Sequence, residues 1–564
     1  MCYFILMDLI QYIKLIKFSN NNEAHKLNVI LAEGYSRILK NKNPIIDQLI
    51  RQICTQELEA VNQYSSRKIF GDLSLKDLSL YKSQVVTNML FNSFYFNRAI
   101  SFYYGKNSSF VFPIKKEWTF IFEDHEIKIN RQASRIMWEI FIFLLTIKNF
   151  FKFIKNILFG LCILKSKSAH TGKNLKHNSI YFCNLGGSNI SFDMKGHKKL
   201  NFVNWYTQNI ATENFSNIYH NVVDFKDSGV DDEGGRNVLG FYHSKLFFGI
   251  SFKDGMKNLG AAIVFMFKIC FKRDDFPLAL FNLGACIDST NAISNSKSIN
   301  LRTVVFNNSV GSVKPLWAVA LERNNIFIDY CFYSTSSEPL DVQKHKKIDG
   351  LWTLASWSRY VVFDELQKQD LQEQLLSQAT IQIAQVLPWW SDIDFDIPNS
   401  GKPTISLFDS ALHNQIYFRG SLNQFGWGSP EIALAYLKVV LEIAEESNLK
   451  VYYKNKRARS IEMRNDEHFY GVISLLAKYK NSVIEIDDRV APVRVIANSF
   501  LTISKPFSTT AVLAESLGKS SVYFDPTGKI LPTDPSSRGL RVFKSKQELK
   551  NYIQALLINV KNFS

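Results

Sequence analysis

The chain has 564 residues, which is too long for a single hydrophobic core and predicts several domains. Hydrophobic residues make up 46% of the sequence and charged residues 21%, which excludes an intrinsically disordered chain. The formal net charge of +16 at pH 7 favours an anionic partner, such as a phosphorylated substrate or an acidic membrane surface. Nucleic acid is excluded as the expected partner, because the basic residues are scattered and no zinc-finger or RNA-binding signature occurs.

The cysteines and the N-terminus both favour a cytoplasmic protein. Seven cysteines lie far apart, without a Cys-x-x-Cys pair, and are expected to be free thiols in a reducing compartment. The first twenty residues are apolar but lack a basic leader and a small-residue cleavage site. They are expected to form an amphipathic helix, at the start of an α-rich but mixed α/β extension over residues 1–134. A further helix is predicted from Ile45 to Asn62.

Residues 135–170 contain a long apolar segment that is interrupted by lysines. A membrane span needs roughly 20 consecutive apolar residues, and Lys148, Lys152 and Lys155 break this one. Their spacing of four and three places them on one side of a helix, with Phe151 among the apolar residues on the remainder. The pattern predicts a basic amphipathic helix in the membrane interface, with these four residues in contact with lipid. The alternative is a core helix whose lysines extend to solvent.

From residue 175 onward, short apolar runs alternate with helical patterns. This alternation predicts parallel sheets covered by helices, in two Rossmann-like, doubly wound domains over residues 175–390 and 400–564. The segment between them is rich in Pro, Gly and Asp and is typical of a linker. In such sheets, ligands bind beyond the carboxyl ends of the strands.

Three hydroxyl residues precede a predicted helix near the end of the chain. Ser508, Thr509 and Thr510 follow Pro506, and Gly518 stands where that helix is expected to end. Ser508 or Thr509 can cap the helix. Because a helix start also offers N–H donors and a partial positive charge, the run is a candidate phosphate site as well.

Two other segments place polar side chains after a predicted strand. The segment from Lys454 to Arg457 puts three cations, including Lys456, where a diphosphate could bind, although a solvated basic loop is an equal alternative. Asp409 ends another strand and His413 follows it. Either residue is a candidate catalytic base or a simple turn residue.

These segments together resemble a known family. The order Phe408-Asp409, then Lys454 to Arg457, then the stretch from Ile503 to Gly528 is similar to bacterial GT-B-type glycosyltransferases of surface polysaccharide and lipopolysaccharide assembly. The resemblance covers roughly residues 300–529. Two departures, Asn455 and Ser520, replace prolines of the family pattern and affect loop stiffness rather than charge.

The resemblance implies transfer of a sugar from a nucleotide-activated donor to a lipid-linked or glycan acceptor. It implies that the donor phosphates and ribose are held without metal by six residues of the second domain: Lys454, Lys456, Arg457, Ser508, Thr509 and Thr510. It also implies a GT-B-like fold. Together with the predicted interface helix, it predicts an enzyme attached peripherally to the cytoplasmic face of the inner membrane. A nucleotide-sugar epimerase of the same fold and a non-catalytic assembly protein are the alternatives.

Carboxylate clusters elsewhere offer a rival chemistry. Asp392, Asp394 and Asp396 alternate in the linker and could hold a divalent cation, but they do not follow a nucleotide-binding strand. The acidic run from Asp231 to Glu233 is typical of a solvated turn. The sequence has no Walker loop, dinucleotide fingerprint or Cys/His metal spacing, so no cofactor is predicted.

Overall fold

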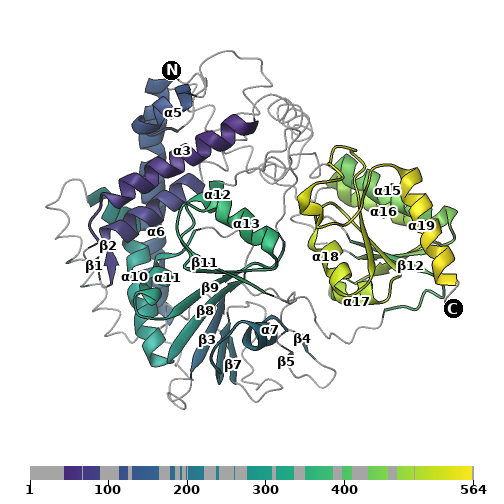
Figure 1. Ribbon diagram of the computed structural model, residues 1–564. Coiled ribbons are helices and arrows are strands. Elements are labelled where there is room, and N and C mark those ends of the chain that lie inside the picture. Colours follow the sequence, from purple (N-terminus) through teal and green to yellow (C-terminus); the bar gives the residue numbers. More distant parts are fainter. Residues whose placement is uncertain are drawn as a thin grey trace.

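A computed structural model of the chain has two parallel sheets that are covered by helices and lie next to each other (Figure 1). The structure describes residues 43–66, 68–70, 72–88, 113–124, 130–163, 178–183, 191–192, 198–199, 201–220, 237–240, 260, 264, 276–307, 313–335, 350–384, 397–408, 430–454, 466–487 and 490–561. This architecture confirms the predicted α/β class with two Rossmann-like domains.

The first sheet has seven parallel strands within the described residues, in the order β11-β10-β9-β8-β3-β6-β7. Its central strands are nearly continuous apolar runs because helices cover both faces. The strand order reverses between β3 and β8, which is a topological switch point. The strands are β3 (Ser179–Cys183), β6 (Asn217–His220), β7 (Asn237–Gly240), β8 (Leu301–Asn307), β9 (Phe327–Cys331), β10 (Arg359–Val362) and β11 (Thr380–Ile383).

The second sheet has six parallel strands within the described residues, in the order β14-β13-β12-β15-β16-β17. Its switch point lies between β12 and β15, because the chain turns back across β12 after β14. The strands are β12 (Thr404–Phe408), β13 (Lys450–Lys454), β14 (Val483–Ile486), β15 (Leu501–Ser504), β16 (Ser520–Phe524) and β17 (Val542–Phe543).

Helices cover both sheets. Those of the first domain are α7 (Asn201–Asn209), α10 (Phe276–Ser298), α11 (Leu316–Glu322), α12 (Gly350–Thr353) and α13 (Glu365–Gln374). Those of the second are α15 (Pro430–Glu446), α16 (Asp466–Lys478), α17 (Pro492–Ala497), α18 (Thr509–Ser516), η3 (Pro535–Ser537) and α19 (Lys546–Lys561). In Figure 1, α17 and α18 lie on the side of the second domain nearest the first, and α19 lies on the far side.

An apolar cluster spans the boundary between the domains. It contains aromatic residues of the first domain, among them Tyr330 and Trp357, together with Ile496, Leu513 and Ala514 from α17 and α18. A separate cluster fills the second sheet and draws its buried residues from that domain. Burial of apolar area at the boundary stabilises the contact between the two domains.

The N-terminal part packs on the first domain. It contains α3 (Asn43–Asn62), β1 (Lys68–Phe70), β2 (Leu73–Ser74), a helix over 75–88, η1 (Lys116–Trp118) and α5 (Thr119–Asp124). A separate two-stranded sheet, β4 (Ser191–Phe192) and β5 (Lys198–Lys199), follows β3 in the chain. Gln84 Nε2 donates a hydrogen bond to the Leu354 carbonyl at 2.7 Å, and Arg323 pairs with Asp77 at 3.1 Å. The helix that the sequence predicts from Ile45 to Asn62 is α3.

Helix α6 (Arg131–Ile163) packs one side against α10 and leaves another side exposed. Asn149 Nδ2 donates to the Phe281 carbonyl of α10 at 3.3 Å, and Leu145 is buried. Within the described residues, every helix is too short or too polar to span a bilayer.

The short apolar runs that predict the two sheets correspond to β3, β8, β9, β10, β12, β13, β14 and β16, and the segment that precedes Pro506 contains β15. Four strands of the two large sheets were not expected: β6, β7, β11 and β17. Each has only two to four residues, and β6 ends in a histidine while β11 reads Thr-Ile-Gln-Ile. Such short segments form strands only because the neighbouring strand supplies their hydrogen bonds.

Candidate functional site

The predicted phosphate-binding segments begin at one edge of the second sheet. Phe408 at the end of β12 is in register with Lys454 at the end of β13. Leu407 pairs with Ile503, so the next residue of β15, Ser504, reaches the same level. Because all these strands are parallel, the chain segments that follow them leave the sheet at the same carboxyl edge, on either side of the switch point.

Lys454 is the part of the basic segment that the structure describes. It is 5% exposed and belongs to β13. Lysine is rarely buried this deeply unless its ammonium group has a partner. Asp409, His413, Lys456 and Arg457 lie outside the described residues, so they remain sequence predictions.

The three hydroxyl residues lie at the start of α18, as expected. The expectation was that Ser508 or Thr509 caps the helix. It is wrong, because Ser508 has the N-cap position but its side chain makes no cap hydrogen bond, and Thr509 is already the first residue of α18. Its hydroxyl lies 3.1 Å from that of Thr510, which lies 2.9 Å from that of Ser504. The side chains bond to one another rather than to the helix N–H groups. The start of α18 therefore has no side-chain cap and keeps its capacity to bind an anion.

Structural roles explain the residues at the end of this motif. Gly518 has a φ of +67° and ends α18, and the Lys519 N–H donates to the Ala514 carbonyl at 2.9 Å. This is a Schellman motif, which favours glycine at that position. Asp525 is buried and accepts hydrogen bonds from the N–H groups of Thr527 and Ile530, both at 2.9 Å. The Phe-Asp-Pro sequence thus shapes a turn.

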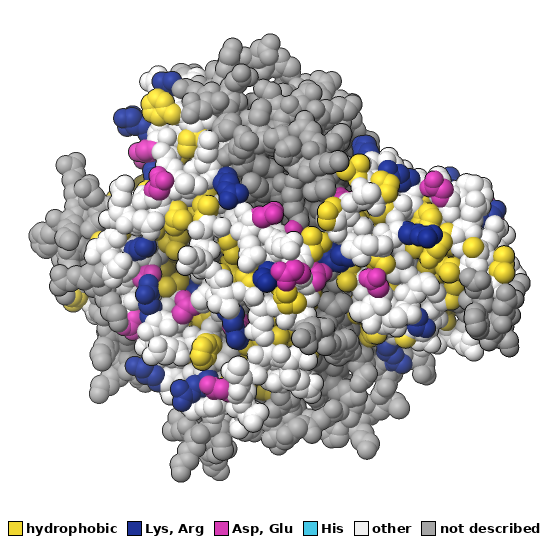
Figure 2. All heavy atoms as spheres, in the orientation of Figure 1, with side chains coloured by type: hydrophobic (Ala, Val, Ile, Leu, Met, Phe, Trp, Pro, Cys, Tyr) yellow, Lys and Arg dark blue, Asp and Glu magenta, His cyan; other side chains and the backbone are white. Residues whose placement is uncertain are grey.

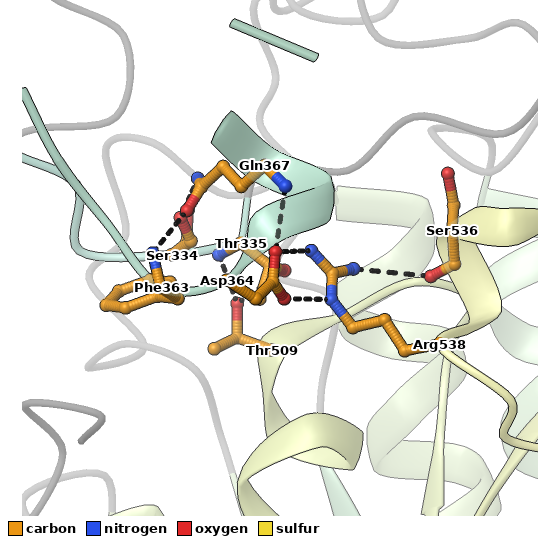
Figure 3. A network of polar contacts seen from close by, with 8 residues as sticks. All are labelled: Ser334, Thr335, Phe363, Asp364, Gln367, Thr509, Ser536 and Arg538. Atoms are coloured by element: carbon orange, nitrogen blue, oxygen red, sulfur yellow. Dashed lines mark hydrogen bonds and ion pairs between the residues drawn. The ribbon is translucent and has the colours of Figure 1, made fainter. Parts of the chain in front are cut away.

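The side chain of Thr509 points toward Thr335 of the first domain (Figure 3). Its hydroxyl accepts a hydrogen bond from the Thr335 N–H at 3.1 Å and lies 3.2 Å from the Thr335 hydroxyl. Thr335 follows β9, so the carboxyl edge of the first sheet faces that of the second. A ligand on the start of α18 would therefore lie beside residues of both domains.

A second polar contact joins the same two edges. Asp364 follows β10 and forms an ion pair with Arg538, which follows η3. Acidic and basic side chains lie side by side over α13, next to the second domain (Figure 2). Burial raises the pKa of the nearby Tyr523 phenol, whereas Arg538 lowers it, and the net shift is upward.

Sequence reasoning missed the residues of the first domain at this boundary. Asp364 and Gln367 carry a usable signal, because Asp-x-x-Gln before a helix is a capping-box pattern. It predicts the start of α13, where Asp364 does accept from the Gln367 N–H. Thr335 and Arg538 have no comparable local signal, because their contacts depend on how the two domains meet.

The predicted membrane residues lie on α6. Lys148 and Phe151 are exposed, while Lys152 and Lys155 lie in the part of the helix whose side chains the structure does not describe. Exposed apolar residues extend further toward the start of α6 than expected. They are Ile136, Ile140, Phe143, Leu144, Phe150 and Phe151, with Phe120 exposed on α5.

No metal site is found in the part of the chain that the structure describes, where His, Cys, Asp and Glu form no suitable cluster. The linker carboxylates Asp392, Asp394 and Asp396 and the acidic run from Asp231 to Glu233 lie outside that part.

Comparison with known proteins gives one family match. Residues 268–553, just over half of the chain, match the family model described as polysaccharide biosynthesis PFTS motif protein. None of the curated proteins matches the chain. Solved structures that are similar to it include a sucrose-phosphate synthase from Thermosynechococcus elongatus (10% identity, TM-score 0.35, 68% of this chain and 90% of that one). Another is a putative UDP-N-acetylglucosamine 2-epimerase from Listeria monocytogenes (9% identity, TM-score 0.34, 68% of this chain and 88% of that one). A third is MurG from Acinetobacter baumannii (8% identity, TM-score 0.28, 67% of this chain and 90% of that one). Similarities of this size identify neither a substrate nor a reaction.

Proposed function

The chain belongs to the family of polysaccharide biosynthesis proteins with a PFTS motif, and we propose that it is a glycosyltransferase that uses a nucleotide-sugar donor. The acceptor is a growing surface glycan of the lipopolysaccharide or capsule type, carried on a lipid at the cytoplasmic face of the membrane. The matched residues include Pro506-Phe507-Ser508-Thr509, the segment that leads into α18.

One observation carries this proposal: the register of the second sheet brings Lys454 and the start of α18 to the same carboxyl edge. The uncapped helix start offers N–H donors and a partial positive charge, and Lys454 offers an ammonium group. Lys456 and Arg457 follow Lys454 directly in sequence and add two more cations. This combination suits the diphosphate of a nucleotide sugar.

The same groups suit the chemistry of transfer. The acceptor oxygen bonds to the anomeric carbon while the bond from that carbon to the phosphate oxygen breaks. The nucleoside diphosphate leaves with the electron pair, and the helix start and cations stabilise its added negative charge. Under this proposal they replace a divalent metal. Asp409 or His413 takes the proton of the acceptor hydroxyl.

Nucleotide sugars should stabilise the purified protein. Thermal unfolding is followed with UDP, GDP, CMP and dTDP sugars, each in large excess. At a hundredfold excess over Kd, binding adds about 2.7 kcal/mol to the unfolding free energy, so one nucleotide class should raise the melting temperature by about 5 °C. The Arg457→Ala variant should lose this shift, because it lacks a charge-assisted contact to the diphosphate. No shift with any of the four would contradict the proposal.

Product analysis separates the alternatives. An epimerase would convert the stabilising nucleotide sugar without any acceptor, whereas a transferase needs the acceptor to release the nucleotide. In cells, Arg457→Ala and Thr509→Ala should both reduce glycan assembly. Intact assembly in both variants would favour a non-catalytic role.

We place the membrane contact on α6. Its exposed residues include Phe143 and Phe151, which are 64% and 66% exposed, and Lys148, which is three residues before Phe151. Apolar side chains next to lysines are the composition of helices that lie in an anionic membrane interface. Lys152 and Lys155 are expected to add to this charge. Peripheral attachment would bring the enzyme close to a lipid-linked acceptor.

Vesicle binding tests this contact. Replacing Ile140 and Phe143 together with serine should weaken binding to anionic vesicles at least tenfold, because burying one such side chain contributes about 1.5–3 kcal/mol. Cosedimentation with vesicles is the measurement. Phe327→Ser is the control, since Phe327 is 59% exposed, which lies between Ile140 at 43% and Phe143 at 64%, but belongs to β9. Equal binding by the double variant and the control would refute this surface.

A further inference from the structure

An ion pair between Asp364 and Arg538 joins the carboxyl edges of the two sheets (Figure 3). Arg538 Nε donates to Asp364 Oδ2 at 2.5 Å, and a terminal nitrogen of Arg538 donates to Oδ1 at 3.2 Å. The guanidinium and carboxylate groups thus meet with two parallel hydrogen bonds, which fix orientation as well as distance. The side chains are 9% and 31% exposed, so salt screens this pair less than a surface pair.

The backbone of Arg538 gives a second reason to assign a role to this side chain. Its φ of 54° and ψ of 35° lie in the left-handed region. The other non-glycine residues with positive φ in the described part of the chain are Asn300, Asn325 and Asn448. Asparagine tolerates this conformation and arginine gains nothing locally from it. A residue other than glycine or asparagine persists in this conformation where surrounding contacts hold it, and the ion pair with Asp364 is one such contact.

On the first domain, the partner of Arg538 is tied to the loop after β9. Asp364 accepts from the Gln367 N–H at 2.8 Å, which caps α13. The Gln367 side chain accepts from the Phe363 N–H at 2.9 Å and donates to the Ser334 carbonyl at 3.0 Å. Ser334 precedes Thr335, whose N–H donates to the Thr509 hydroxyl at 3.1 Å. Hydrogen bonds, together with the peptide bond between Ser334 and Thr335, therefore link Arg538 to the start of α18.

We infer that Asp364 and Arg538 are positioning residues, whose ion pair holds the loop around Thr335 against Thr509. The pair sets where the start of α18 lies relative to the first domain, and neither residue needs to touch a substrate. This inference concerns the contact between the domains and holds whichever ligand the site binds.

Amide hydrogen exchange reports on this contact directly, because the Thr335 N–H is one of its donors. Arg538→Gly removes the side chain and keeps a residue that adopts positive φ without cost. Asp364→Asn keeps an acceptor for the α13 cap and removes the charge. In peptides that contain Thr335, each variant should exchange this amide at least tenfold faster than the unaltered protein. The double variant should exchange no faster than the faster single variant, because both substitutions break the same contact.

Two controls keep the result interpretable. Arg541→Ala removes a nearby arginine that stacks on Tyr552 within the second domain, and it should leave Thr335 exchange unchanged. The Ala384 amide, which donates to the Val362 carbonyl at 2.7 Å, should stay protected in every variant if the first sheet is intact. Unchanged exchange at Thr335 in both Arg538→Gly and Asp364→Asn would overturn the inference, even if the protein proves to be a glycosyltransferase. Loss of protection at both amides would also overturn it, since the pair would then support the whole domain.

Discussion

Replacing Lys454 with methionine is expected to weaken nucleotide-sugar binding by about tenfold to a hundredfold. A hydrogen bond to a charged group contributes about 1.5–3 kcal/mol, and each 1.4 kcal/mol is a factor of ten in affinity. Methionine has a similar length and keeps the packing of the buried stem at the end of β13, so the change removes mainly the charge. Titration calorimetry with the nucleotide sugar that stabilises the protein is the measurement.

Lys450→Met is the matched control. Lys450 begins the same strand, and its ammonium group donates to the Asn481 carbonyl at 2.6 Å, at the opposite edge of the sheet. Its replacement should leave the Kd unchanged. The melting temperature without ligand shows whether either variant alters the fold. Equal affinity of both variants in folded protein would show that the carboxyl edge of β13 does not bind the donor.

The largest effect on stability is expected at Asp329, in the middle of the first sheet. This carboxylate is 1% exposed, accepts from Arg359 Nε at 2.5 Å, and accepts a hydrogen bond from the Tyr206 hydroxyl. Asp329→Ala leaves the partly buried guanidinium group without its partner. Removing one member of a buried ion pair costs about 3–5 kcal/mol; because Arg359 is partly exposed, about 3 kcal/mol is expected. Urea unfolding followed by tryptophan fluorescence measures it, since Trp205 and Trp357 lie in the same domain.

Glu365→Gln provides the comparison for an exposed ion pair. Glu365 pairs with Lys368 on the surface of α13, and such pairs contribute about 0–1 kcal/mol. Tyr206→Phe removes a single donor to Asp329 and should cost about 1 kcal/mol. If Asp329→Ala were no more destabilising than Glu365→Gln, the buried network would not hold the first sheet together.

The fold was largely predictable because its central strands are apolar on both faces. Val451 to Tyr453 and Val304 to Phe306 read as buried strands without any knowledge of their neighbours. The edge strands β7, β11 and β17 carry no such pattern, and β11 is half polar. Their pairing partners, which the sequence does not reveal, determine that they are strands.

The part of the candidate site that lies on the second domain was predictable from the sequence. The hydroxyl run at the start of α18 follows from local rules for helix starts, even though the role expected for the Ser508 side chain was wrong. The first-domain side was not, because Thr335 and Thr509 are 174 positions apart and meet only when the domains pack. The conformation of Arg538 was equally hidden, since arginine has no preference for positive φ.

The apolar cluster between the domains has a consequence for work on isolated pieces of the chain. The core of the second sheet is assembled from residues between Ile405 and Ile553, so a fragment beginning near Ile397 carries that core intact. Such a fragment would nevertheless leave Ile496 and Leu513 in water, where they would drive self-association. A truncated protein for solution spectroscopy should therefore carry polar substitutions on α17 and α18.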